Sequence, residues 1–166
     1  IVRAVTIPVI ANGDISSVEK ARAVLALTGA AGVMIGRAAQ GQLWLPGAIA
    51  SALCAEDEGA RTPALSEQLG LQGDHLLRLH EFHGHHLGPR IARKHQAWLL
   101  ESLTAQQAIS ADDARAWRQA FNGIESAEEQ IVCLREMTDA LMSAVSATAP
   151  TSQMSPPMCP QMLVAA

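Results

Sequence analysis

Two short apolar runs, each ending in a glycine turn, constrain the fold of this chain most strongly. They are "IPVIANGDI", Ile7 to Ile15, and "GVMIGRAAQG", Gly32 to Gly41. Short β-branched runs bounded by turn residues predict strands, here over residues 5–11 and 31–36. A capped helical pattern lies between them, and another follows the second run. Because strands that are apolar on both faces are typical of parallel sheets, we expect a β-α-β-α unit with buried strands.

The pattern changes after residue 55. Residues 56–64 read as a polar linker, and residues 65–146 carry helical patterns without a strand signal. Residues 147–166 are rich in Ser, Thr, Pro and Met, a composition that predicts disorder. The expected fold class is therefore α/β followed by all-α. Since two strands do not form a stable sheet alone, we expect further strands upstream in a longer gene, or in a partner.

Composition limits the possible classes of function. The net charge is −4 and the isoelectric point about 5.8, so only a local basic patch would indicate nucleic acid. No apolar run reaches the length of a membrane span, and three scattered cysteines suit a reducing cytoplasm. Histidines cluster at His80, His83, His85 and His86 without a matching Cys or carboxylate, so we predict no metal site.

The glycine turns are candidate phosphate-binding loops. In (β/α)8 barrels the loops after the last two strands commonly bind a phosphate, because glycine lets backbone N–H groups approach the anion. An arginine adds a charged guanidinium that can donate bidentate hydrogen bonds to phosphate. Spacing alone leaves ordinary turns as an alternative. The candidate residues are Asn12, Gly13, Asp14, Gly36 and Arg37.

A basic stripe lies in the helical part. Arg90, Arg93 and Lys94 share one helical face in "PRIARKHQAW". In an acidic chain such a stripe is suited to contact nucleic-acid phosphates. A solvated helix face is the alternative that the pattern leaves open.

Together these stretches resemble the C-terminal half of the bacterial tRNA-dihydrouridine synthases, of the B-type subfamily. The resemblance covers roughly residues 7 to 131 and is specific, because motifs in both parts agree in order and spacing. The matching motifs are "IPVIANGDI", "KARAVL", "TGA", "MIGRAAQG", "LHEF", "RIARKH" with Trp98, and "FNGIE" followed by "EQ".

The resemblance implies the C-terminal strands and helices of an FMN-binding TIM barrel, followed by a helical tRNA-binding bundle. It implies reduction of a tRNA uridine to 5,6-dihydrouridine, with NADPH as reductant, by an enzyme expected to be monomeric and cytoplasmic. The glycine turns match the FMN phosphate loops, and the Arg90–Lys94 stripe matches the tRNA-facing segment.

No catalytic residue is assigned, because neither Cys54, Cys133 nor Cys159 matches the context of the family's acid cysteine. The alternatives are another FMN-dependent barrel reductase and a non-catalytic RNA-binding helical module.

Overall fold

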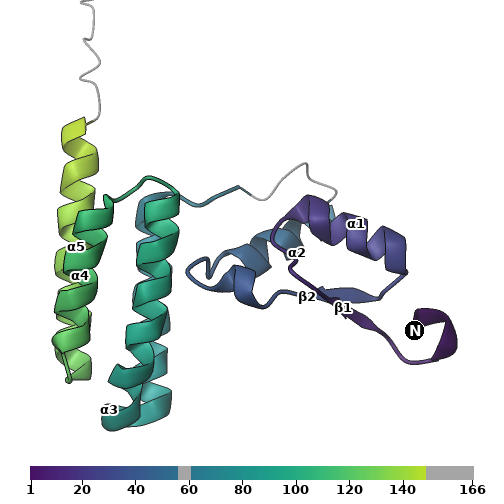
Figure 1. Ribbon diagram of the computed structural model, residues 1–166, viewed down its shortest axis with the longest axis horizontal. Helices are drawn as coiled ribbons and strands as arrows, with labels where there is room; N and C mark the ends of the chain where they lie inside the picture. Colours follow the sequence, from purple (N-terminus) through teal and green to yellow (C-terminus); the bar gives the residue numbers. More distant parts are fainter. Residues whose placement is uncertain (56–60, 149–166) are drawn as a thin grey trace, which may run out of the picture.

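The computed structural model describes residues 1–55 and 61–148. The predicted tail from residue 149 onward, and residues 56–60 of the predicted linker, lie outside the described residues. The described chain has two parts, a small α/β unit and a bundle of long helices (Figure 1). The last helix of the α/β unit ends at Ala55, and the first helix of the bundle begins at Leu65.

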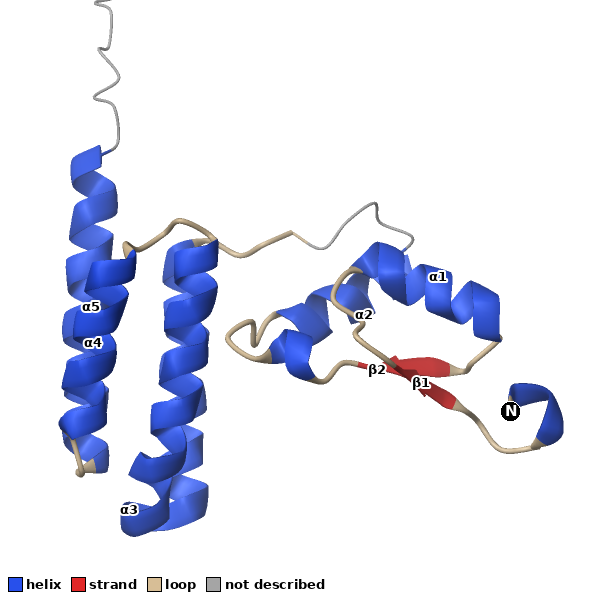
Figure 2. Cartoon of the chain, viewed as in Figure 1, coloured by secondary structure: helices blue, strands red, loops and turns tan. Residues whose placement is uncertain are grey.

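The α/β unit contains two parallel strands and two helices (Figure 2). Its strands β1 and β2 pair through Ile10↔Gly32, Ala11↔Val33 and Asn12↔Met34. The elements in chain order are η1 (Val2–Ala4), β1 (Ile10–Asn12), α1 (Val18–Thr28), β2 (Gly32–Met34), η2 (Arg37–Ala39) and α2 (Leu45–Ala55).

Local signals at both ends explain why α1 forms where it does. The Ser17 side chain accepts a hydrogen bond from the Lys20 N–H at 3.2 Å and so caps the helix start. Gly29 ends the helix at φ 66°, a left-handed conformation that glycine adopts without steric cost. Apolar residues of α1 and α2, with Ile15, form the unit's core. The predicted β-α-β-α order is confirmed.

The prediction of buried strands is wrong for this structure. Only three residues of each run pair as a strand, and Ile7 and Ile10 are 71% and 57% exposed. Within the described residues the sheet has two strands only, so the face away from the helices lacks a covering layer. The burial of an apolar strand depends on neighbours, and the sequence pattern does not supply them.

The helical part contains α3 (Leu65–Ala105), α4 (Ala111–Gly123) and α5 (Ala127–Thr148). Helix α3 reverses direction at Gly84, whose φ of 72° and ψ of 179° are not helical. It therefore consists of two limbs, residues 65–83 and 85–105, which lie side by side as an antiparallel hairpin. The amide side chains of Gln72 and Gln96, 3.2 Å apart, pair across the hairpin.

The core of the bundle is apolar and draws on all three helices. Leu76 and Leu103 of α3 are fully buried, and they share a cluster with Phe121 of α4 and Met137 of α5. The helical pattern predicted for residues 65–146 is thus confirmed, and Gly84 divides its first helix into two limbs.

Candidate phosphate and nucleic-acid sites

The two glycine turns lie at the same edge of the sheet. Asn12 ends β1, and Gly36 follows β2 as the N-cap of η2. Because the strands are parallel neighbours, their carboxyl ends meet at one edge. Gly13 has φ 148° and Asp14 has φ 45°, so the first turn uses backbone conformations that glycine and aspartate tolerate best. The structure thus brings the predicted loop residues together.

An ion pair joins the two loops. Arg37 Nη2 donates to Asp14 Oδ1 at 2.5 Å, across 23 residues of sequence. Lys20, from the first turn of α1, places its Nζ 3.1 Å from the Asp14 carbonyl oxygen. The Asp14 carboxylate repels an anion, so its side chain orients Arg37 rather than binding phosphate directly. Lys20 is a nearby cation that sequence reasoning missed. Its position in the first turn of the helix that follows the loop could have indicated it.

The donor set at this edge fits a phosphate group. Arg37 supplies a guanidinium, Lys20 an ammonium, and the glycine turns supply backbone N–H groups. A Cβ built on Gly13 or Gly36 meets no atom within 4 Å, so the backbone there is open to a ligand. The arrangement can bind the phosphate end of a nucleotide, while the rest of such a ligand requires a surface beyond these loops.

The three residues of the basic stripe differ in their exposure to solvent. Arg90 and Lys94 are exposed, whereas Arg93 is half-buried and its Nη2 donates to the Ile124 carbonyl at 3.0 Å. Lys94 Nζ lies 4.8 Å from the centre of the Trp98 ring, a cation–π contact. Arg93 therefore ties α3 to the junction between α4 and α5 in addition to any contact with a ligand.

Two histidines beneath the stripe form a pair. His75 Nε2 and His95 Nδ1 lie 2.9 Å apart, and the His95 ring also contacts Trp98 edge to face. Burial lowers the pKa of both imidazoles, and the charges of His75 and Lys94 lower that of His95 further. These lowered pKa values favour the neutral form of both imidazoles, so we attribute the positive charge of this surface to arginine and lysine.

The loop that follows β2 contacts the helix of the basic stripe at Gly41. This residue is buried at φ 73°, and a Cβ there would lie 2.1 Å from the Trp98 carbonyl oxygen. A cavity of about 200 Å³ lies along this seam, lined from one side by Gly36 and Gly41 and from the other by His95 and Trp98. The loop that carries Arg37 therefore packs directly on the helix that carries Lys94.

Metal sites and membrane spans are absent from the described residues. In the parts of the chain that the structure describes, no three His, Cys, Asp or Glu side chains are arranged to hold a metal ion. Within residues 1–55 and 61–148, no helix is long and apolar enough to cross a membrane.

These features define a class of protein: an α/β unit with two glycine turns at one edge of its parallel sheet, joined to a helical bundle that carries a basic stripe. The family model described as "Dihydrouridine synthase (Dus)" matches residues 1–146, and the chain belongs to that family. The match covers both the glycine turns and the bundle.

Curated relatives agree with this result. The chain is 45% identical over 142 residues to tRNA-dihydrouridine synthase B of Vibrio cholerae, a match that covers 84% of this chain and 41% of that protein. It is 46% identical over 136 residues to the Pseudomonas syringae pv. tomato protein of the same name, covering 81% and 37%. The predicted resemblance to the B-type synthases is confirmed. The chain spans about two fifths of the length of these relatives.

Proposed function

We propose that this chain forms part of a B-type tRNA-dihydrouridine synthase, which reduces uridine in tRNA to 5,6-dihydrouridine with FMN and NADPH. The observation that carries this proposal is the 45% identity over 84% of the chain to a protein named tRNA-dihydrouridine synthase B. Because the family match continues through the bundle to residue 146, a barrel reductase without an RNA-binding domain is a poorer explanation. A monomeric enzyme in the cytoplasm is the corresponding expectation.

In this proposal the α/β unit is the last part of a TIM barrel, and its glycine turns hold the phosphate of FMN. Asn12, Gly13, Asp14, Gly36 and Arg37 would surround the phosphate. FMN, when bound, supplies the hydride chemistry. The exposure of Ile10 on β1, and of Ile7 just before it, supports the assignment to a barrel, because a complete barrel would cover these apolar side chains.

The proton donor is not assigned to a described cysteine. Cys54 lies on α2, away from the glycine turns in sequence, and is exposed. Cys133 is buried in the core of the bundle, where desolvation raises the pKa of its thiol. The role of the described residues is to bind and position FMN and tRNA.

We expect Arg37→Ala to weaken FMN retention in the assembled enzyme. Loss of a charged hydrogen bond to phosphate should cost about 1.5–3 kcal/mol of binding free energy. The measurement is the dissociation constant of FMN from flavin fluorescence, with Arg3→Ala as the control because Arg3 lies in η1, outside the loops. Full flavin retention on dilution would show that Arg37 does not contact the phosphate.

We expect Lys94→Ala to weaken tRNA binding without changing which uridine is reduced, because Lys94 is an exposed charge suited to a phosphate contact. Removal of one phosphate contact should flatten the slope of log affinity against log salt by about 0.7–0.9. Arg93→Ala should also weaken binding, but it removes the bond to Ile124 and so needs a parallel stability measurement. The measurement is tRNA titration at several salt concentrations, with helix content checked by circular dichroism. Unchanged affinity and slope in folded Lys94→Ala protein would favour a solvated helix face.

A further inference from the structure

We propose that Arg118 and Asn122 of α4 contact the RNA backbone, and that they form one wall of a groove whose other wall is the basic stripe of α3. This inference rests on the proposed function and extends the RNA surface from one helix to two. The sequence stripe contained neither residue, because α4 follows α3 by a turn whose direction the sequence does not reveal.

The groove is a feature of the folded bundle. Lys94, Trp98 and Glu101 of α3 line one side, and Arg118 and Asn122 of α4 line the other. Its volume of about 510 Å³ falls within the range of ligand-binding clefts, and both α4 side chains are exposed. The ammonium of Lys94 lies over the Trp98 ring, and this cation–π contact holds it along the wall of the groove.

The charge of the groove suits a polyanion. Arg93, Lys94 and Arg118 provide three cations against the single carboxylate of Glu101. The cleft on the other side of the stripe contains Arg90 and shares Arg93, but it also contains two carboxylates, Glu125 and Glu128. RNA phosphates are therefore better accommodated between α3 and α4 than towards the start of α5.

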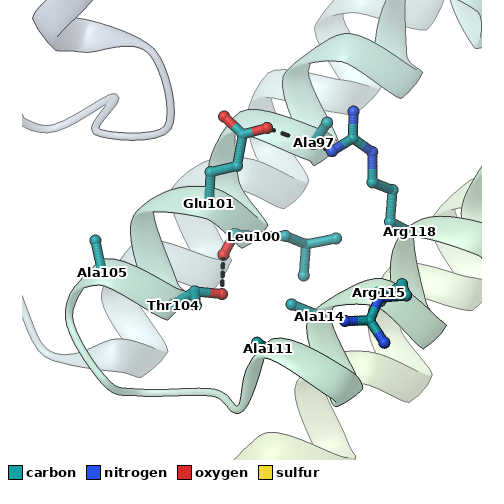
Figure 3. A pocket seen from close by; sticks show the side chains of 9 residues that line it. All are labelled: Ala97, Leu100, Glu101, Thr104, Ala105, Ala111, Ala114, Arg115 and Arg118. Carbon is teal, nitrogen blue, oxygen red and sulfur yellow. Dashed lines mark hydrogen bonds and ion pairs between the residues drawn. The ribbon is translucent and has the colours of Figure 1, made fainter.

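Arg118 is held in a position from which it can exchange partners. Its Nη1 lies 3.3 Å from Glu101 Oε1, and the two side chains are 52% and 63% exposed. Figure 3 shows this pair bridging α3 and α4 beside an apolar pocket. Exposed ion pairs contribute little stability, whereas a phosphate can accept bidentate hydrogen bonds from a guanidinium. A phosphate can thus replace Glu101 as the partner of Arg118. Because the Glu101 carboxylate repels phosphate, it lowers the affinity of the groove for RNA.

A nucleic-acid strand accounts for this set of groups better than an acidic peptide. The groove combines cations with an indole face and the amide of Asn122. Phosphate contacts from arginine, lysine and asparagine, with an aromatic ring beside them, are the usual components of single-strand and backbone recognition.

The test compares two arginines one helical turn apart on α4. Both arginines border the apolar pocket, but only Arg118 also lines the groove, whereas Arg115 is paired with Asp112 on its own helix. In titrations of the protein with an unmodified tRNA transcript, Arg118→Ala should weaken binding about three- to tenfold and flatten the salt slope by about 0.7–0.9. Arg115→Ala should change affinity less than about twofold, as a bulk charge effect. Glu101→Gln should strengthen binding.

The outcomes separate this inference from the proposed function. If Lys94→Ala weakens tRNA binding while Arg118→Ala and Arg115→Ala behave alike, the two-helix groove is wrong and the RNA role of α3 stands. If none of the three folded variants affects binding, the RNA role of this surface is wrong as a whole. If polyglutamate of matched charge competes as effectively as tRNA, the groove binds polyanions generally and the inference of an RNA site is overturned.

Discussion

Replacing Gln130 by Ala is expected to lower the free energy of unfolding of the bundle by about 3–5 kcal/mol, because it removes the three hydrogen bonds of a buried side chain and leaves the Nε2 atom of buried His80 without its partner. Gln130 is fully buried on α5. Its Nε2 donates to the carbonyls of Pro89 and Ile124 at 3.1 and 3.3 Å, and its Oε1 lies 2.9 Å from His80 Nε2. One side chain thus fixes the hairpin of α3 and the junction between α4 and α5.

Chemical denaturation followed by circular dichroism measures this effect. Gln119→Ala is the matched control, because Gln119 is an exposed glutamine of α4 and should change stability by less than about 0.5 kcal/mol. A decrease of less than about 1 kcal/mol for Gln130→Ala would show that the His80–Gln130 network is not needed to hold the bundle together.

Gly41→Ala is expected to separate the α/β unit from the bundle. The added Cβ would lie 2.1 Å from the Trp98 carbonyl oxygen and 2.6 Å from its carbon, both backbone atoms of a helix. A left-handed φ of 73° costs a residue with a side chain about 1–2 kcal/mol in addition. Since the helix backbone cannot shift locally without breaking its own hydrogen bonds, the loop must move away.

Small-angle scattering and hydrogen exchange measure this separation. The radius of gyration should rise, and backbone amides near Trp98 should exchange faster. Gly47→Ala is the control, because Gly47 lies in α2 with no atom within 4 Å of its added Cβ, and alanine favours the helix by about 0.5–1 kcal/mol. Unchanged scattering and exchange in Gly41→Ala would contradict the direct packing of the Arg37 loop on α3.

Local signals predicted much of this structure. The capped helical pattern between the two apolar runs predicted α1, because capping by Ser17 and left-handed termination at Gly29 depend on residues close in sequence. The reversal of α3 coincides with Gly84 for the same reason. The glycine turns were placed correctly because the carboxyl ends of neighbouring parallel strands meet at one edge.

Contacts between distant residues were not predictable in this way. Asp14 and Arg37 were both assigned to phosphate, yet the structure pairs them with each other. Arg93 was placed on a solvent-facing stripe, yet it is half-buried and bonded to Ile124. The partner of His80 lies 50 residues away on α5. Helical spacing shows which residues share a face, but it does not show which other helix packs on that face.

The central claim is that this chain supplies the FMN-phosphate loops and the RNA-binding bundle of a dihydrouridine synthase. The most direct test is to place residues 1–146 in the corresponding position of the Vibrio relative and to measure dihydrouridine in tRNA from cells that lack their own B-type enzyme. We expect the chimera to restore dihydrouridine, and its Arg37→Ala and Lys94→Ala forms to restore less of it. A folded chimera that retains flavin but leaves dihydrouridine at the background level would contradict the account.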